Sequence, residues 1–222
     1  CEKKADDFDK ELIKKIESLE ISDFYPTDRL PEGYNTEQPK RSRNIYHVHQ
    51  FFTKRNLFVL ARLYSKIEAS PIADKLRFIF TGMINRSTVM NRVHVSNYFY
   101  GGGGWNAGHL KGTLYVPNAP VETSVLEQIS DKVSALSRAA EFLTKRKDNL
   151  QYVGSADNLT IEDNSVDYIF VDPPFGANIN YSELNFLPEP WLKVITNNRH
   201  EAIENSGQNK SADFYRDMMV RC

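Results

Sequence analysis

The sequence predicts an α/β domain whose sheet is incomplete within the chain and whose N-terminal part is helical. Helical spacing of apolar residues dominates the first ninety or so positions, and a strand–loop–strand pattern appears only after residue 149. The composition supports a globular chain, because 41% of the 222 residues are hydrophobic and 26% are charged. We therefore divide the chain into a helical region, 1–92, and an α/β region, 93–222.

The composition also excludes several classes of protein. No apolar run approaches the roughly 20 residues that a membrane helix requires, so we expect no membrane span. The formal net charge is −1, which neither indicates nor excludes a nucleic-acid partner. The only two cysteines, Cys1 and Cys222, lie at the two ends, which indicates a reducing compartment and no internal disulfide framework. Because the chain opens on Cys1 and not on methionine, we interpret it as a fragment.

The helical region divides at its prolines. Residues 2–20 place apolar side chains on one face of a charged helix, and residues 53–69 predict a second helix. Pro71 then begins a third, which continues to Met83. Between the first two we expect a polar, proline-broken loop that ends in the basic residues 40–43.

The α/β region begins with two runs typical of strands. Residues 93–100 and 112–116 are rich in β-branched and aromatic side chains, and Gly101–Gly104 would form a flexible hairpin loop between them. A long helix follows over 121–147. We then expect strands at 150–153 and 166–171, and helices over the ranges 181–187, 190–196 and 209–221.

The strand at 166–171 runs directly into Asp172, Pro173, Pro174 and Phe175. In an open α/β sheet, ligands bind beyond the carboxyl ends of strands, so these residues would face a site. An aromatic amine is a poor nucleophile; a carboxylate and a backbone carbonyl that each accept one of its N–H bonds favour a more tetrahedral nitrogen. The prolines fix the backbone, and Phe175 offers a face on which a flipped-out base can stack. A strand-terminating turn is the plainer interpretation.

This tetrapeptide resembles the catalytic Asp-Pro-Pro-Tyr/Phe motif of the amino-group DNA methyltransferases. The resemblance implies a Rossmann-like, S-adenosylmethionine-dependent methyltransferase domain that methylates adenine N6 or cytosine N4, with adenine preferred. It gives Asp172 and the Pro173 carbonyl the two hydrogen bonds to the amine, Pro174 the rigid loop and Phe175 the stacking. Double-stranded DNA with a flipped target base would be the partner, and whether a restriction-system partner accompanies it stays open.

The cofactor-binding residues are implied by the same resemblance. Gly154, Ser155, Asp157 and Asn158 precede the strand in a segment similar to the family's lead-in, whose acidic residue contacts the adenine of the cofactor. Here Ser155 occupies the usual acidic position, which makes Asp157 the second candidate for that contact.

Further segments are similar to a narrower group, the large bacterial methylases that are often described as adenine-specific and carry an upstream zinc ribbon. Collinear matches cover about three quarters of the chain, and a bacterial cytoplasmic location follows from them. They lie at 47–57, 103–106, 176–184 and 189–192.

One family feature is missing, the glycine-rich turn that approaches the methionine part of the cofactor. We therefore expect the chain to have little activity alone and to bind S-adenosylmethionine weakly. Two alternatives stay open: a non-catalytic DNA-recognition or assembly module with a methylase-like scaffold, and an RNA base N-methyltransferase.

Basic residues supply the candidate DNA contacts. Lys40, Arg41, Lys54 and Arg55 lie in or beside the family-like segments and would neutralise phosphates, although a solvated surface is the commoner role for such residues. For the histidines at 47 and 49 we expect an exposed strand face and no metal, because no Cys or carboxylate is nearby. Trp105 and Trp191 are most simply core residues.

Overall fold

The structure, a computed structural model, describes residues 4–140 and 154–222. Its described part is mixed: mostly helical, with one small two-stranded antiparallel sheet. The first part contains, in order, α1 (Asp7–Glu17), α2 (Tyr34–Arg43), the 3₁₀ helix η1 (Val48–Phe51), α3 (Lys54–Glu68), α4 (Ala73–Ile84), η2 (Asn85–Ser87), β1 (Arg92–Val93), α5 (Val95–Tyr100), β2 (Asn106–Gly108) and α6 (Val125–Ala140).

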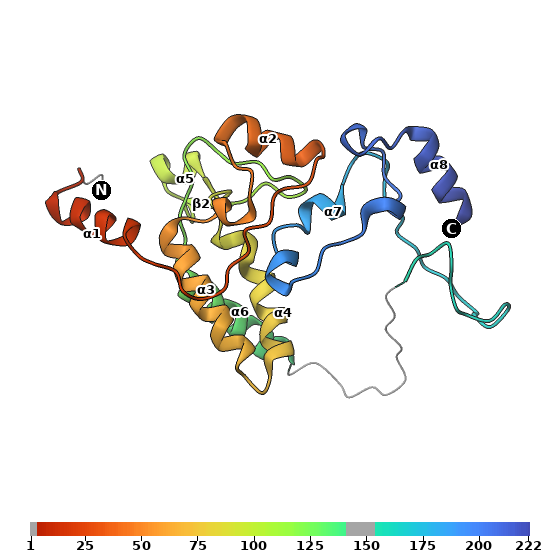
Figure 1. The fold of residues 1–222 in the computed structure, drawn as a ribbon, viewed down its shortest axis with the longest axis horizontal. Helices are drawn as coiled ribbons and strands as arrows, with labels where there is room; N and C mark the ends of the chain where they lie inside the picture. Colours follow the sequence, from red (N-terminus) through yellow and green to blue (C-terminus); the bar gives the residue numbers. More distant parts are fainter. Residues whose placement is uncertain (1–3, 141–153) are drawn as a thin grey trace.

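The second part contains only short helices. In order they are α7 (Tyr181–Leu184), η3 (Glu189–Leu192), η4 (Asn198–His200), η5 (Ser206–Gln208) and α8 (Ala212–Arg221). Figure 1 shows the chain from red α1 to blue α8, with α3, α4 and α6 packed side by side. Among the described residues, no helix combines the length and apolarity that crossing a membrane requires.

The long helices confirm the sequence prediction, and the structure shows how two of them begin. Helix α3 begins after Thr53, whose hydroxyl accepts the backbone N–H of Asn56 at 3.2 Å. Helix α1 begins after Asp6 in a reciprocal capping box with Asp9. Helix α6 is described to Ala140, and the rest of its predicted extent lies outside the described residues.

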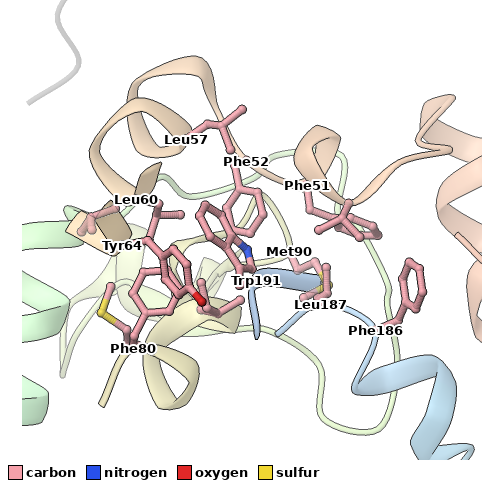
Figure 2. Packing of buried hydrophobic residues seen from close by; sticks show 14 of the residues in the cluster. Phe51, Phe52, Leu57, Leu60, Tyr64, Phe80, Met90, Phe186, Leu187 and Trp191 are labelled. Atoms are coloured by element: carbon pink, nitrogen blue, oxygen red, sulfur yellow. The ribbon is translucent and has the colours of Figure 1, made fainter. Parts of the chain in front are cut away.

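The hydrophobic core combines residues from the first part of the chain with residues that follow the candidate motif. Trp191, on η3, is fully buried and meets Phe52, Tyr64 and Phe80 edge-on, with ring centroids 6.1, 5.7 and 5.2 Å away. Figure 2 shows this indole beside Phe52, which follows η1, and beside Tyr64 of α3 and Phe80 of α4. Phe186 is buried in the same cluster. One hydrophobic core therefore crosses the boundary at residue 92, and the division into two regions stays a prediction.

The sequence prediction was wrong about the strands of the α/β region. Residues 95–100 form helix α5, because the His94 ring accepts the Asn97 N–H at 3.2 Å and caps it, and Gly101, at φ +75°, ends it. No strand forms at 112–116 or 166–171 within the described residues; β1 pairs instead with β2, Arg92 opposite Gly108. The predicted strand at 150–153 lies outside the described residues.

Two other local predictions were also wrong. The proline-broken loop contains helix α2, in which Pro39 removes one backbone donor without ending the helix. Its first turn is capped from a distant segment, as described below. The histidine pair does not lie on a strand: His47 precedes η1, whose side chains Val48 and Phe51 point into the core.

The helices predicted near the C-terminus are present but shorter than expected. The predicted range 181–187 contains α7, 190–196 overlaps the 3₁₀ helix η3, and 209–221 contains α8. Lys193, at φ +56°, ends η3 in the left-handed region, which accounts for its early stop.

Candidate functional site

The Asp172–Phe175 segment lies at the surface, at the end of a long exposed stretch. Every residue from 154 to 173 is exposed, and the apolar run that was expected to be a buried strand is exposed with it. In Figure 1 this teal chain extends away from α3, α4 and α6, below α8. The segment is therefore not placed at the edge of a sheet in the described structure.

Contacts from the last helix hold the second half of the tetrapeptide. The Tyr215 hydroxyl, on α8, donates to the Pro174 carbonyl at 2.6 Å, and the Glu204 N–H donates to the Gly176 carbonyl at 3.2 Å. Gly176 turns the chain at φ +55°, and the Asn178 N–H closes that turn on the Phe175 carbonyl at 3.0 Å. The exit from the motif is thus fixed to the C-terminal part of the chain.

The first half of the tetrapeptide is left available. No described residue donates a hydrogen bond to the Asp172 carboxylate or to the Pro173 carbonyl, and both residues are exposed. The Phe175 ring is 67% exposed. A carboxylate, a carbonyl and an aromatic face are therefore open to a ligand along one short segment.

The candidate cofactor residues form a turn of their own. The Ser155 hydroxyl donates to the Asp157 carboxylate, and the Asn158 N–H donates to the Ser155 carbonyl at 3.2 Å. Gly154 completes this exposed turn. No hydrogen bond among the described residues joins this turn to Asp172–Phe175.

A buried carboxylate that sequence reasoning missed supports the segment after the motif. Glu183, on α7, is fully buried and accepts the backbone N–H groups of Tyr34 and Asn35 at 3.1 and 2.6 Å. These are orphan donors of the first turn of α2, where a negative charge is favourable. The side-chain amide of Asn205 also donates to this carboxylate. Glu183 thus ties the post-motif segment to α2.

A second polar contact stabilises the same region. The Glu201 carboxylate accepts the Ser182 N–H at 2.9 Å and its hydroxyl at 2.5 Å. The buried Lys210 amine donates to the carbonyls of Glu201, at 2.8 Å, and Asn198. Burial lowers the pKa of Lys210, and the nearby Glu201 carboxylate opposes that change. Only Ser182 lies in a family-like segment, 176–184, and no sequence signal indicated Glu201 or Lys210.

The structure pairs most of the four candidate DNA contacts with carboxylates of the chain. Lys40 is buried and paired with Glu32 and Glu37, at 3.0 and 3.3 Å. Arg41 also pairs with Glu37. Lys54 is half-buried. Three of the four cations already have an internal carboxylate partner, so their predicted phosphate contacts gain no support.

Arg55 shows the same internal pairing most clearly. It pairs with Glu122 at 2.7 Å. Burial raises the pKa of Glu122, but hydrogen bonds from Arg55 and Thr53 outweigh it and leave that pKa lowered.

Two further expectations have opposite outcomes. Trp191 is a core residue as predicted, but Trp105 is 52% exposed, so its assignment to the core was wrong. Gly101–Gly104 form an exposed loop as expected, although it connects α5 to β2 and is not a hairpin. Within the described residues, no three His, Cys, Asp or Glu side chains lie close enough together to hold a metal ion.

Comparison with known proteins adds no further constraint. No protein-family model, no curated protein and no solved structure matches this chain.

Proposed function

We propose that this chain carries the amine-binding part of an S-adenosylmethionine-dependent DNA methyltransferase, which methylates adenine N6 in preference to cytosine N4. The observation that supports the proposal is the state of the tetrapeptide. Tyr215 fixes the Pro174 carbonyl, while the Asp172 carboxylate and the Pro173 carbonyl have no partner among the described residues. This leaves two acceptors for the two N–H bonds of an exocyclic amine.

Each residue of the motif has one task in this proposal. Asp172 accepts one N–H of the amine, and the Pro173 carbonyl accepts the other, which draws the nitrogen toward a tetrahedral, nucleophilic geometry. Phe175 stacks on the base once it has left the duplex. The rate gain comes from positioning and from preorganised acceptors, so the rigidity of the proline pair matters.

The described residues fit only one end of the implied cofactor. The Ser155–Asn158 turn offers a carboxylate and amides suited to an adenosine group, whereas no described segment has a glycine-rich strand-to-helix turn for the methionine end. When bound, S-adenosylmethionine supplies the methyl group. The same missing turn favours the second candidate function, a non-catalytic DNA-recognition or assembly module on a methylase-like scaffold.

Asp172→Ala separates the two functions. In the native gene product that carries these 222 residues, we expect this change to abolish methyl transfer to DNA, because the amine loses its charged acceptor. DNA affinity should change less than about threefold, because phosphate contacts dominate affinity. Turnover is measured with labelled S-adenosylmethionine, and affinity by fluorescence anisotropy.

Asp167→Ala is the matched control. It removes another exposed aspartate, five positions earlier in the chain, and this variant should retain turnover. Wild-type rates in the Asp172→Ala protein would refute the assignment, whereas an unmutated gene product that binds DNA but transfers no methyl group would favour the module.

A further inference from the structure

A cavity lined by polar and cationic side chains lies beside the small sheet, away from the Asp172 segment. Its volume is about 260 Å³, and β2 forms one wall while η2 and α6 form others. The lining residues are Arg86, Asn91, the strand β2, His109, Lys111 and Gln128. None of these described residues is acidic, so the cavity carries positive charge that nothing in its lining neutralises.

The positive charge of the cavity also affects the pKa of His109. Burial lowers the pKa of this imidazole, and the charges of Arg86, Lys111 and Arg92 lower it further. Arg86 and Lys111 are exposed and have no carboxylate partner within residues 4–140 and 154–222. This contrasts with Lys40, Arg41 and Arg55, whose carboxylate partners are internal.

A second cavity adjoins the first along helix α6. The second has a volume of about 310 Å³ and shares Arg86 and Gln128 with the first. It adds Lys132 and Arg138, against one acid, Asp131. The Lys132 side chain lies over Gly82 of α4, where an added Cβ would come within 2.7 Å of it. We call the two adjoining, cation-lined cavities together the α4–α6 groove.

We propose that the α4–α6 groove binds the phosphodiester backbone of nucleic acid, specifically double-stranded DNA. Cations line both of the adjoining cavities, which suits the repeated negative charge of a phosphodiester backbone. Neutralising successive phosphates releases counterions, which is the main source of sequence-independent affinity. The choice of DNA rests on the proposed function; the groove and its charge do not.

The test uses the full 222-residue chain and a fluorescently labelled 20-base-pair duplex. The triple variant Arg86→Ala/Lys111→Ala/Arg138→Ala removes three exposed groove cations that make no side-chain hydrogen bond or ion pair in the described structure. We expect at least a tenfold loss of affinity at low salt. The slope of log affinity against log salt concentration should fall by about 2 to 3, roughly one unit for each lost phosphate contact.

The matched control removes equal charge elsewhere. Lys15→Ala/Lys66→Ala/Lys75→Ala takes three exposed lysines from α1, α3 and α4, none of which lines either cavity. Its affinity and salt slope should stay close to those of the wild type. An equal loss of DNA affinity in both triple variants would overturn the groove assignment, because binding would then depend on total charge and not on the position of the cations.

A single substitution tests the groove with less change to the protein. Gln128 lines both cavities, so Gln128→Glu places a carboxylate where the phosphates would pass and should weaken DNA binding severalfold. Ser130→Glu adds the same charge to the same helix outside the cavities and should have little effect. Unchanged binding by Gln128→Glu, with normal helicity by circular dichroism, would contradict the proposal.

Two further arms separate the alternatives. Calorimetric titration with inorganic phosphate tests a single-anion site, and saturable binding of phosphate without any DNA effect of the variants would overturn the proposal. A failure of the native gene product to transfer methyl groups would contradict the proposed function but not the groove. The Asp172→Ala protein should still bind DNA through the groove. DNA binding that is lost in the triple variant and kept in Asp172→Ala therefore assigns the binding to the groove.

Discussion

At the scale of single residues, Glu183 shows how the chain after the candidate motif is held. Its buried carboxylate lies against the first turn of α2, and the backbone there must approach it closely. Gly33 makes this approach possible, because an added Cβ would lie 2.0 Å from a Glu183 carboxylate oxygen and 2.4 Å from its Cδ. The sequence offered Gly33 only as a loop residue, since the partner is 150 positions away.

Gly33→Ala should therefore destabilise the chain by about 1–3 kcal/mol, the usual cost of an added methyl group in a filled space. The change is measured as the shift in the free energy of unfolding in urea, followed by circular dichroism. Gly104→Ala is the control, because nothing lies within 4 Å of its added Cβ and the residue is exposed. Equal stability of the two variants would contradict the close contact with Glu183.

His49 gives the chain a pH-dependent stability. Burial lowers the pKa of this imidazole below its ordinary 6.5, and the neighbouring His47 lowers it further. The unfolded chain then binds more protons than the folded chain as the pH falls through about 6.5, so stability present above that pH is lost below it. The lowered pKa values of carboxylates such as Glu32 and Glu122 act in a separate window, below about 4.5.

We expect the urea midpoint to fall between pH 7.5 and pH 5.5, and His49→Gln to lessen that fall. His109, whose pKa is lowered in the same direction, accounts for part of what is left. A fall of the same size in the wild type and in His49→Gln would contradict this role.

At the scale of elements, the short helix η3 completes the core formed by α3 and α4. Its Trp191 fills the space between Phe52, Tyr64 and Phe80 (Figure 2). Trp191 was expected in the core from sequence, but its partners in the N-terminal region could not be predicted. Such long-range packing depends on shape and not on a local pattern.

Trp191→Ala should cost about 3–5 kcal/mol, the range for removing a large buried aromatic side chain, and it should loosen α7 together with η3. The free energy of unfolding in urea measures the cost. Trp105→Ala removes the other tryptophan of the chain, which is 52% exposed, and should change stability by less than about 0.5 kcal/mol. Similar losses in the two variants would mean that η3 is not part of the core.

The same scale shows where prediction from sequence succeeded and failed. Helices α3 and α6 carry apolar side chains at helical spacing and both were predicted, although α6 begins at Val125 and not at 121. Helix α2 was missed because Pro39 suggested a loop and its cap, Glu183, is distant in sequence. Residues 95–100 were misassigned because aromatic and β-branched side chains favour strands only when a neighbouring strand is there to pair with them.

At the scale of the whole molecule, a helical core supports an exposed segment that bears the candidate motif. The core contains none of residues 154–173, all of which are exposed, and the Tyr215 hydroxyl ties the motif to α8. The chemistry assigned to Asp172–Phe175 comes from residue types and a family resemblance, and it stays a prediction. The sequence could not predict the Tyr215 contact or the α4–α6 groove, which both arise from residues that are far apart in the chain.

The central claim is that Asp172–Phe175 presents an exocyclic amine for methylation. The most direct measurement incubates the native gene product with duplex DNA and S-adenosylmethionine bearing a deuterated methyl group, and then identifies the modified nucleosides by mass spectrometry. We predict labelled N6-methyladenine, absent when Asp172 is changed to Ala. Labelled methyl groups formed equally by the Asp172→Ala protein, or no labelled nucleoside from an unmutated protein that binds the duplex, would contradict the account.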